Sequence, residues 1–194
     1  MLRAIAPRAR GAQRRLFSRP EAFRAVLTRA LARRGGEGAA MVRTTRAVTR
    51  LTGSAGDNVI AERATASLNA RIAIGSTVAR TADEIRRAIR DDQVQVEVLY
   101  GDDPSPVSPS SGPEWDRLVE TIAEVFPEAA PAPYVMLQAS DSRHFARISD
   151  TVYRFLPFEM AAGDRATLHA IDESISIENW KRGIAFFDAL LGRL

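Results

Sequence analysis

The stretch that decides the fold lies at residues 64–74 and reads ATASLNARIAI. Apolar side chains alternate here with mostly polar ones, and a period of two is typical of a half-buried β-strand. Successive side chains of a strand point to opposite faces, so Leu68 and Arg71 are expected on different faces. We therefore predict a sheet with one buried face and with Arg71 on the other.

Flanking segments extend this strand into a small sheet with helices. Residues 42–52 are rich in β-branched side chains, and residues 94–99 alternate like a third strand. Residues 21–34 carry apolar side chains at helical spacing, and residues 81–91 also predict a helix. This order favours an α+β fold with a ferredoxin-like layout, an antiparallel sheet with two helices on one face. The first strand of that layout would precede residue 21, where no strand pattern is found.

The second of these helices has a recognisable start and a predicted buried stripe. Thr81 and Glu84 have the spacing of a capping box, in which each residue's side chain binds the other's backbone N–H. The apolar residues expected to be buried are Ile85, Ala88 and Ile89.

A proline-rich stretch separates two predicted domains. Residues 101–113, GDDPSPVSPSSGP, contain four prolines and end the pattern described above. We place a boundary there, with a domain at 21–104, a second at 105–194, and a basic segment at 1–20.

The second domain is predicted to mix helices and short strands. A helix starts at Pro113, residues 134–138 and 152–158 read as strands, and a last helix begins near Ser174 or Ser176. The apolar side chains of the last helix that are expected to face inward are Ile177, Trp180, Ile184, Phe187 and Leu191.

Composition excludes several classes of protein. The chain has no cysteine, which excludes disulfides, zinc fingers, iron–sulfur clusters and thiol nucleophiles. No window of about 18 unbroken apolar residues exists, so no membrane span is expected. No apolar segment follows Arg3, so a secretory signal is not expected and a cytoplasmic location is the expectation.

Charge is distributed unevenly along the chain. Residues 1–50 hold 13 arginines and two acids, a sum of +11, so the remaining residues carry −8 to give the total of +3. A basic segment of this kind is compatible with nucleic acid or anionic lipid, and its first 20 residues resemble a mitochondrial transit peptide. No aromatic stacking platform or known binding module accompanies the charge. Our expectation is therefore that the chain binds no nucleic acid.

Few side chains suit catalysis or metal binding. His169 is followed by Asp172 and Glu173, and a histidine flanked by carboxylates is a plausible metal ligand. A catalytic zinc, however, needs about three protein ligands, and the chain has two histidines in all. His144 is better explained as an ordinary helix residue. The guanidinium of Arg71 suits carboxylate binding, although in a chain with this many arginines a solvated arginine on an open sheet face is the better explanation from the residues alone.

Several segments taken in order resemble the zinc aminoacylase/glutamate-carboxypeptidase family, and most closely its branch of carboxypeptidase S and the N-fatty-acyl amino acid synthase/hydrolases. The family has an Asn-Val-Ile-Pro turn before a strand that ends in arginine, and this chain has Asn58 to Ala61 and then Asn69 to Arg71. The other segments that carry the resemblance are RTTRAVTRLTGSAG (43–56), SPVSP (105–109), SDSRHF (140–145), YRFLPF (153–158) and HAIDESISIENW (169–180).

This resemblance implies a fold and roles for named residues. The first domain would be the family's lid and dimerisation domain, present incompletely, and the second would be the C-terminal segment of an α/β zinc-hydrolase catalytic domain. His169 would ligate one zinc of a pair, and Asn58 and Arg71 would bind the substrate carboxylate or polarise the scissile carbonyl. Arg143 is a further candidate for that role. In such enzymes a metal-bridging hydroxide attacks the amide, with glutamate as the general base.

The departures from the family pattern bear on activity. Ala61 replaces the turn proline, His144 replaces an aromatic residue, and Ala170 and Asp172 differ from the His-Gly-x-Asn-Glu segment. The family's His-x-Asp motif, its Glu-Glu pair and its lid histidine are absent from these residues. We expect a homodimeric hydrolase of N-acyl amino acids or short peptides, represented by a truncated chain that is inactive alone. The alternatives are a non-catalytic dimerising module and a basic nucleic-acid binder.

Overall fold

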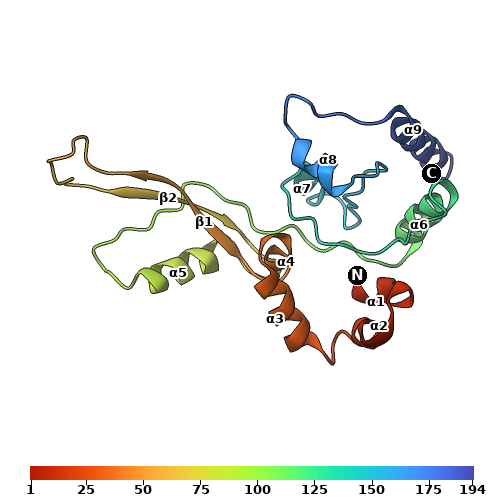
Figure 1. Ribbon diagram of the computed structural model, residues 1–194, viewed down its shortest axis with the longest axis horizontal. Coiled ribbons are helices and arrows are strands. Elements are labelled where there is room, and N and C mark those ends of the chain that lie inside the picture. Colours follow the sequence, from red (N-terminus) through yellow and green to blue (C-terminus); the bar gives the residue numbers. More distant parts are fainter. The chain divides into compact units, whose positions relative to one another are not determined.

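The structure, a computed structural model, describes residues 1–194 apart from the side chains of Ala162, Arg165 and Ala166. The chain forms two compact units. Residues 20–105 form the first, which we call the ribbon unit, and residues 1–19 with 106–194 form the second, the helical unit. Figure 1 shows the elements of each unit along the chain.

The ribbon unit is built on two antiparallel strands (Figure 1), β1 at Thr45–Thr52 and β2 at Thr65–Arg71. Both lie where β-branched content and alternation predicted strands. Val48 pairs with Leu68, and Leu51 pairs with Ala66. Between these pairs Thr49 is an extra residue, because Arg50 is already opposite Ser67. This bulge places Val48 and Leu51 on the same face of the ribbon, although their spacing of three residues would otherwise put them on opposite faces.

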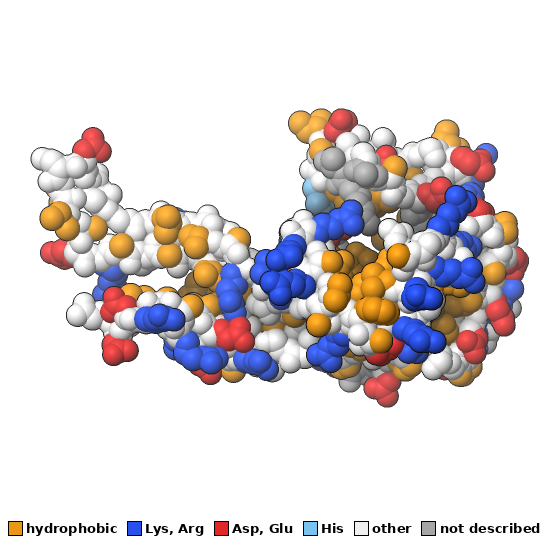
Figure 2. Space-filling model, turned by 60° about the horizontal axis from the view of Figure 1, so that its bottom comes forward, with side chains coloured by type: hydrophobic (Ala, Val, Ile, Leu, Met, Phe, Trp, Pro, Cys, Tyr) orange, Lys and Arg blue, Asp and Glu red, His pale blue; other side chains and the backbone are white. Residues whose placement is uncertain are grey.

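The predicted burial of one sheet face is wrong for this unit. The side chains of Val48, Leu51 and Leu68 are 57%, 73% and 40% exposed. Hydrophobic side chains are accordingly visible along the surface of the ribbon (Figure 2). The reason is that two strands make a narrow sheet, and its apolar face needs a second layer to cover it.

Three helices accompany the ribbon: α3 at Arg24–Arg34, α4 at Gly36–Ala40 and α5 at Val78–Ile89. The first and last confirm the helices predicted at 21–34 and 81–91, while α4 was not predicted. An ion pair between Arg46 of β1 and Glu84 connects α5 to the start of the ribbon. The Arg46 guanidinium holds the pKa of Glu84 below its usual value. The mixed α+β class is thus correct, with a sheet of two strands among the described residues.

The predicted cap of α5 is wrong by one helical turn. Its N-cap is Thr77, whose hydroxyl accepts a hydrogen bond from the backbone N–H of Arg80 at 3.1 Å. Thr81 lies inside the helix, where its N–H donates to the Thr77 carbonyl, and its side chain is buried with Ala82. The predicted buried stripe is also wrong in part: Ile85 is half-buried, and Ala88 and Ile89 are exposed.

The third predicted strand, at residues 94–99, is not formed in the structure. Its alternation suited a strand, but the backbone carbonyl of Val96 accepts a hydrogen bond from the Arg86 guanidinium at 3.1 Å. A side chain of α5 thus binds a backbone group that a strand would use for sheet pairing. Residues 94–99 thus alternate like a strand but pair with neither β1 nor β2.

The helical unit has its core between two helices, α6 at Pro113–Val125 and α9 at Ile177–Leu191. Both starts were predicted, since Pro113 opens α6 and Ser176 caps α9. The buried cluster consists of Leu118, Ile122, Phe126 and Phe186, with Val125, Tyr153 and Leu190 packed against it. The shorter helices are α1 at Leu2–Ile5, η1 at Ala6–Arg8, α2 at Gly11–Ser18, α7 at Ser142–Phe145 and α8 at Ala162–Thr167.

A segment at residues 152–160, which we call the extended segment, runs beside α9 without forming a sheet strand, so the prediction of a strand at 152–158 is wrong. Its backbone groups bind side chains instead: Asn179 of α9 accepts from the N–H of Glu159 at 2.9 Å and donates to its carbonyl at 2.8 Å. The Ser108 hydroxyl binds both backbone groups of Val152 in the same way. The strand predicted at 134–138 is also absent from the described backbone.

The face of α9 that packs inward differs from the prediction. Gly183 and Phe186 are its buried residues. Gly183 is needed because a Cβ at that position would overlap the ring of Phe158, which is stacked on Trp180 with an interplanar angle of 1°. The residues predicted to face inward are instead 43–75% exposed: Ile177, Trp180, Ile184, Phe187 and Leu191.

Arg182 joins three parts of the helical unit. Its guanidinium pairs with Glu128 after α6 and with Glu159 of the extended segment, and donates to the Val125 carbonyl at 3.2 Å. The same group lies 4.3 Å from the centre of the Phe126 ring, in a cation–π contact. Hydrogen bonding to Arg182 lowers the pKa of Glu128 from its ordinary value.

We predict that Gly183→Ala destabilises the chain, because its methyl group would displace the Phe158 ring from Trp180. The expected loss is about 1–3 kcal/mol in the free energy of unfolding, measured by urea denaturation. Gly192→Ala is the matched control, since Gly192 has ordinary helical backbone angles and a Cβ there meets only normal contacts. Equal stability of both variants would contradict the packing described here.

Glu128 also predicts a pH dependence. Its pKa is lower in the folded chain than when unfolded, so its pairing stabilises the fold above the ordinary carboxyl pKa and is lost as pH falls through the folded value. Thermal melts should therefore show Glu128→Gln less stable than wild type at neutral pH, with the difference vanishing once the pH falls below the lowered folded pKa of Glu128. Glu120→Gln, on an exposed face of α6, should match wild type throughout. A Glu128→Gln deficit that persists in acid would contradict the assignment.

Candidate functional site

Asn58 lies in the turn that joins β1 to β2, at the far end of the ribbon, and is exposed. The turn is held locally by Ser54, whose hydroxyl donates to the Gly56 carbonyl at 2.8 Å and accepts from the Gly56 N–H at 3.2 Å. The N–H of Val59 donates to the Gly56 carbonyl at 3.4 Å. These bonds form the turn without the proline that Ala61 replaces, and they leave the Asn58 amide at the surface.

Arg71 lies at the other end of the ribbon. It is the last residue of β2 and pairs with Thr45, the first residue of β1. A seven-residue strand is about 20 Å long, and Asn58 lies beyond its opposite end. A single ribbon therefore separates these two predicted substrate-binding residues by roughly the length of a strand.

His169 follows α8 in an exposed turn. Its backbone is in the left-handed region with φ of 66°, which is uncommon for a residue other than glycine. The backbone N–H of His169 donates to Oε2 of Glu173 at 2.8 Å. The Glu173 carboxylate thus holds the turn through the backbone of His169.

Arg143 lies in α7 beside the other histidine. Its Nε donates to Nε2 of His144 at 3.3 Å, and both side chains are exposed. This hydrogen bond requires an unprotonated Nε2 on His144. The geometry makes Arg143 and His144 a local polar pair on the surface of the helical unit.

The described side chains offer few groups that could bind a metal ion together. Among residues whose side chains the structure describes, no group of three or more His, Asp or Glu lies close enough together to hold a metal ion. A catalytic zinc requires about three protein ligands. The described side chains therefore do not form a complete two-zinc site, and His169 remains a candidate for a single ligand.

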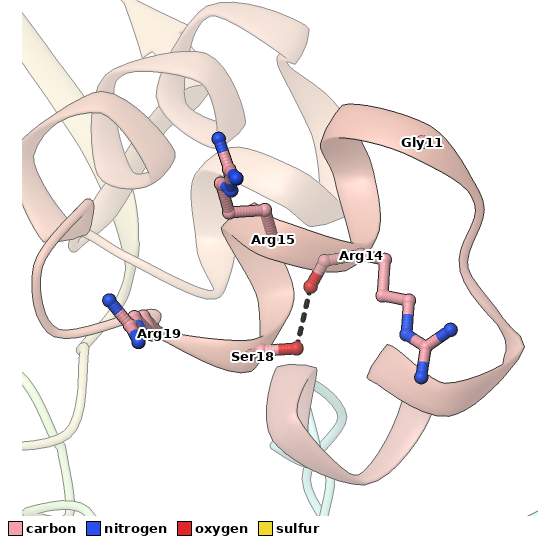
Figure 3. A pocket seen from close by; sticks show the side chains of 5 residues that line it. All are labelled: Gly11, Arg14, Arg15, Ser18 and Arg19. Carbon is pink, nitrogen blue, oxygen red and sulfur yellow. Dashed lines mark hydrogen bonds between the residues drawn. The ribbon is translucent and has the colours of Figure 1, made fainter.

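A basic hollow along α2 was not predicted. It has a volume of about 570 Å³ and is lined by Gly11, Arg14, Arg15, Ser18 and Arg19. Figure 3 shows the three guanidinium groups pointing in different directions, while the Ser18 hydroxyl donates to the Arg14 carbonyl at 2.7 Å. Arginines repeated at short spacing within residues 10–19 were the available signal. Because these cations do not converge, the hollow is a basic surface without a common centre for one small anion.

Within the described part of the chain, no helix combines the length and apolar character needed to cross a bilayer.

The sequence comparisons identify a known domain that covers most of the ribbon unit. Residues 18–97 match the family model of the peptidase dimerisation domain of M20 peptidases. The match covers β1, β2 and α3 to α5. It does not reach α6 or α9 of the helical unit.

Curated relatives match a larger part of the chain. A probable carboxypeptidase S-like protein of Dictyostelium discoideum is 31% identical over 177 residues, which is 91% of this chain and 34% of the relative. The N-fatty-acyl-amino acid synthase/hydrolase of Mus musculus is 35% identical over 76% of this chain and 30% of its own length. Carboxypeptidase S of Saccharomyces cerevisiae is 27% identical over 75% of this chain.

The chain spans about a third of the length of the curated relatives that it matches. No solved structure matches it.

Proposed function

We propose that this chain is part of a zinc-dependent amide hydrolase. It carries the dimerisation domain of M20 peptidases, and it is a distant homologue of carboxypeptidase S and the N-fatty-acyl-amino acid synthase/hydrolases. The substrates would be N-acyl amino acids or short peptides with a free carboxylate. The ribbon unit would act as a ferredoxin-like lid, and the helical unit would form the C-terminal segment of the catalytic domain.

One observation carries this proposal: the similarity extends well beyond the dimerisation domain. That domain accounts for residues 18–97, whereas the relative in Dictyostelium discoideum matches over 177 residues. Most of the helical unit is therefore similar to a protein named for peptidase activity. A dimerisation domain that functions without a hydrolase would not need the matched residues outside 18–97.

The roles proposed for individual residues follow their positions. His169, in its exposed turn, would supply one ligand to the metal pair when the other ligands are present. Arg71 presents a planar fork of donors suited to a carboxylate, and Asn58 would donate from the turn to a carbonyl oxygen. Since these two residues lie a strand's length apart, one ribbon cannot bring both to one small substrate, whereas two copies could. Arg143 is a secondary candidate for the carboxylate.

By itself the chain should lack activity. The donor groups of the described residues do not make a zinc pair, and the family's general base has no counterpart here. A non-catalytic dimerising module is the second candidate function, because the same incomplete donor set accompanies a dimerisation domain. The two candidates differ in whether His169 matters to hydrolysis.

We predict that the purified chain retains no stoichiometric zinc and hydrolyses no N-acyl amino acid, as measured by elemental analysis and product release. Zinc-dependent hydrolysis by the chain alone would overturn this expectation. The decisive assay replaces the matched 30% of the Mus musculus synthase/hydrolase with this chain. In that chimera, His169→Ala should lower kcat/KM by at least about a hundredfold, since even indirect support of a metal ligand is worth 10–100-fold.

His144→Phe provides the control for the chimera, because it changes the chain's other histidine to the aromatic type that the family pattern has. It should leave kcat/KM unchanged. A chimera that folds but shows no activity would favour the non-catalytic module. An active chimera whose kcat/KM is unchanged by His169→Ala would contradict the role of His169 as a metal ligand.

We also propose that the chain forms a homodimer through the ribbon unit. The apolar face that bears Val48, Leu51 and Leu68 is left exposed, and a second copy would bury it. Leu51→Asp should weaken dimerisation by about tenfold or more, because it places a charge in the buried contact. Analytical ultracentrifugation should detect this change as a smaller fraction of the species with twice the chain mass of 21.2 kDa.

Ser67→Asp supplies the matched control for the dimer, since its cross-strand partner Arg50 is on the opposite face of the ribbon from Leu51. It should leave the dimer unaffected. A monomer at all concentrations, or equal effects of both substitutions, would contradict this contact.

A further inference from the structure

Residues 10–34, which we call the arginine segment, concentrate positive charge at the surface. They hold eight arginines and a single acid, Glu21, so their net charge is +7. The whole chain carries +3, so all other residues together sum to −4. The segment contains helices α2 and α3, and each of its arginine side chains is exposed: Arg10, Arg14, Arg15, Arg19, Arg24, Arg29, Arg33 and Arg34.

The arginines of this segment differ from several others in what they contact. Elsewhere an arginine is paired with an acid, as Arg46 is with Glu84 and Arg182 is with Glu128. Among the side chains that the structure describes, none forms an ion pair or a hydrogen bond with a guanidinium of the arginine segment. Like charges in one short stretch repel one another, and an external anionic surface would relieve that repulsion.

In the helical unit, α2 spreads its charges and does not focus them. Arg14, Arg15 and Arg19 border the basic hollow, and their guanidinium groups point in different directions (Figure 3). This arrangement suits no single small anion. Attraction to an extended charged surface needs no common centre, because it acts over about 8–10 Å at moderate salt concentrations.

In the ribbon unit, α3 combines charge with an apolar side chain on its exposed face. Val26 is 61% exposed, and Arg29 and Arg33 lie three and seven residues after it, on the same face of the helix. Leu27 and Leu31, on another side, are half-buried. Such a face suits the interface of a bilayer, where the apolar group enters the acyl boundary and long cationic side chains reach the headgroups.

From this charge and its arrangement, we propose that the arginine segment binds the surface of a bilayer that contains anionic phospholipid. The headgroups supply the complementary charge. Clusters of about four to eight basic side chains are of the size that holds a protein at such a surface. The binding is peripheral, and α2 and α3 can each contact headgroups without the other. It is a property additional to the proposed hydrolysis and does not depend on it.

Nucleic acid is the competing polyanion, and the side chains of the segment favour lipid. Proteins that bind single strands stack the bases on aromatic rings, whereas the two aromatic residues of the segment, Phe17 and Phe23, are half-buried. A duplex would attract the arginines but would offer no apolar layer to the exposed Val26. An anionic bilayer offers both.

Co-sedimentation of the full chain with lipid vesicles tests this proposal. Vesicles of phosphatidylcholine with about a third of phosphatidylserine should bind the chain at low salt, and vesicles of phosphatidylcholine alone should not. Each arginine near an anionic bilayer contributes about fivefold to the affinity. Arg29→Gln combined with Arg33→Gln should therefore weaken binding by about tenfold or more, and so should Arg14→Gln combined with Arg15→Gln.

Arg63→Gln combined with Arg147→Gln is the matched control, because it removes two exposed arginine charges outside the segment. This variant should bind like wild type. Val26→Ser, which keeps every charge, should weaken binding to vesicles by about threefold or more, because an apolar contact is lost. The same variant should bind duplex DNA no more weakly than wild type.

Circular dichroism of each variant checks its folding, and the two arginine pairs lie in different helices, so misfolding of one variant leaves the other to decide. Equal binding to both kinds of vesicle, or equal effects of the control and the two arginine pairs, would overturn the proposal. Release from vesicles by inorganic phosphate, beyond the effect of chloride at equal ionic strength, would indicate a small-anion site and would also overturn it. Binding to duplex DNA without binding to vesicles would do the same.

Discussion

The guanidinium of Arg182 is the contact on which the helical unit depends. It binds Glu128, Glu159 and the Val125 carbonyl, and it lies over the Phe126 ring. The end of α6, the extended segment and α9 therefore meet at one side chain. A planar cation with several donors can satisfy three acceptors in different directions, which a lysine ammonium on its flexible stem would do less well. Both the polar contacts of Arg182 and the apolar cluster around Phe186 therefore join α6 to α9.

Much of the local structure followed from sequence patterns, because local rules decide it. The β-branched content near Thr45, the alternation around Leu68, Pro113 at the start of α6 and the Ser176 cap all predicted elements that formed. Burial was less predictable, because it depends on partners. The apolar spacing in α9 predicted the stripe from Ile177 to Leu191 as the inward face, whereas the helical unit covers the side that bears Gly183 and Phe186. Similarly, residues 94–99 alternate like a strand, but their burial and pairing require a neighbour that the alternation does not encode.

The candidate site was predictable as a set of residue types and not as an arrangement. The sequence singled out Asn58, Arg71, Arg143 and His169 through their resemblance to a family pattern. The structure places the first two at opposite ends of a ribbon and shows His169 tied to Glu173 through its backbone. None of these residues converges with three metal donors among the described side chains. Convergence depends on every segment that surrounds a site, and this chain matches about a third of the length of its relatives.

The bulge at Thr49 has a further consequence for how β1 can change over time. Thr49 is the surplus residue, because Val48, Arg50 and Leu51 pair with the consecutive residues Leu68, Ser67 and Ala66. Deletion of Thr49 would place Arg50 and Leu51 one and two residues after Val48, which is the regular alternation for these same pairs. Leu51 would then keep its face of the ribbon. The bulge therefore lets β1 tolerate the gain or loss of one residue at this point without an exchange of its apolar and polar faces.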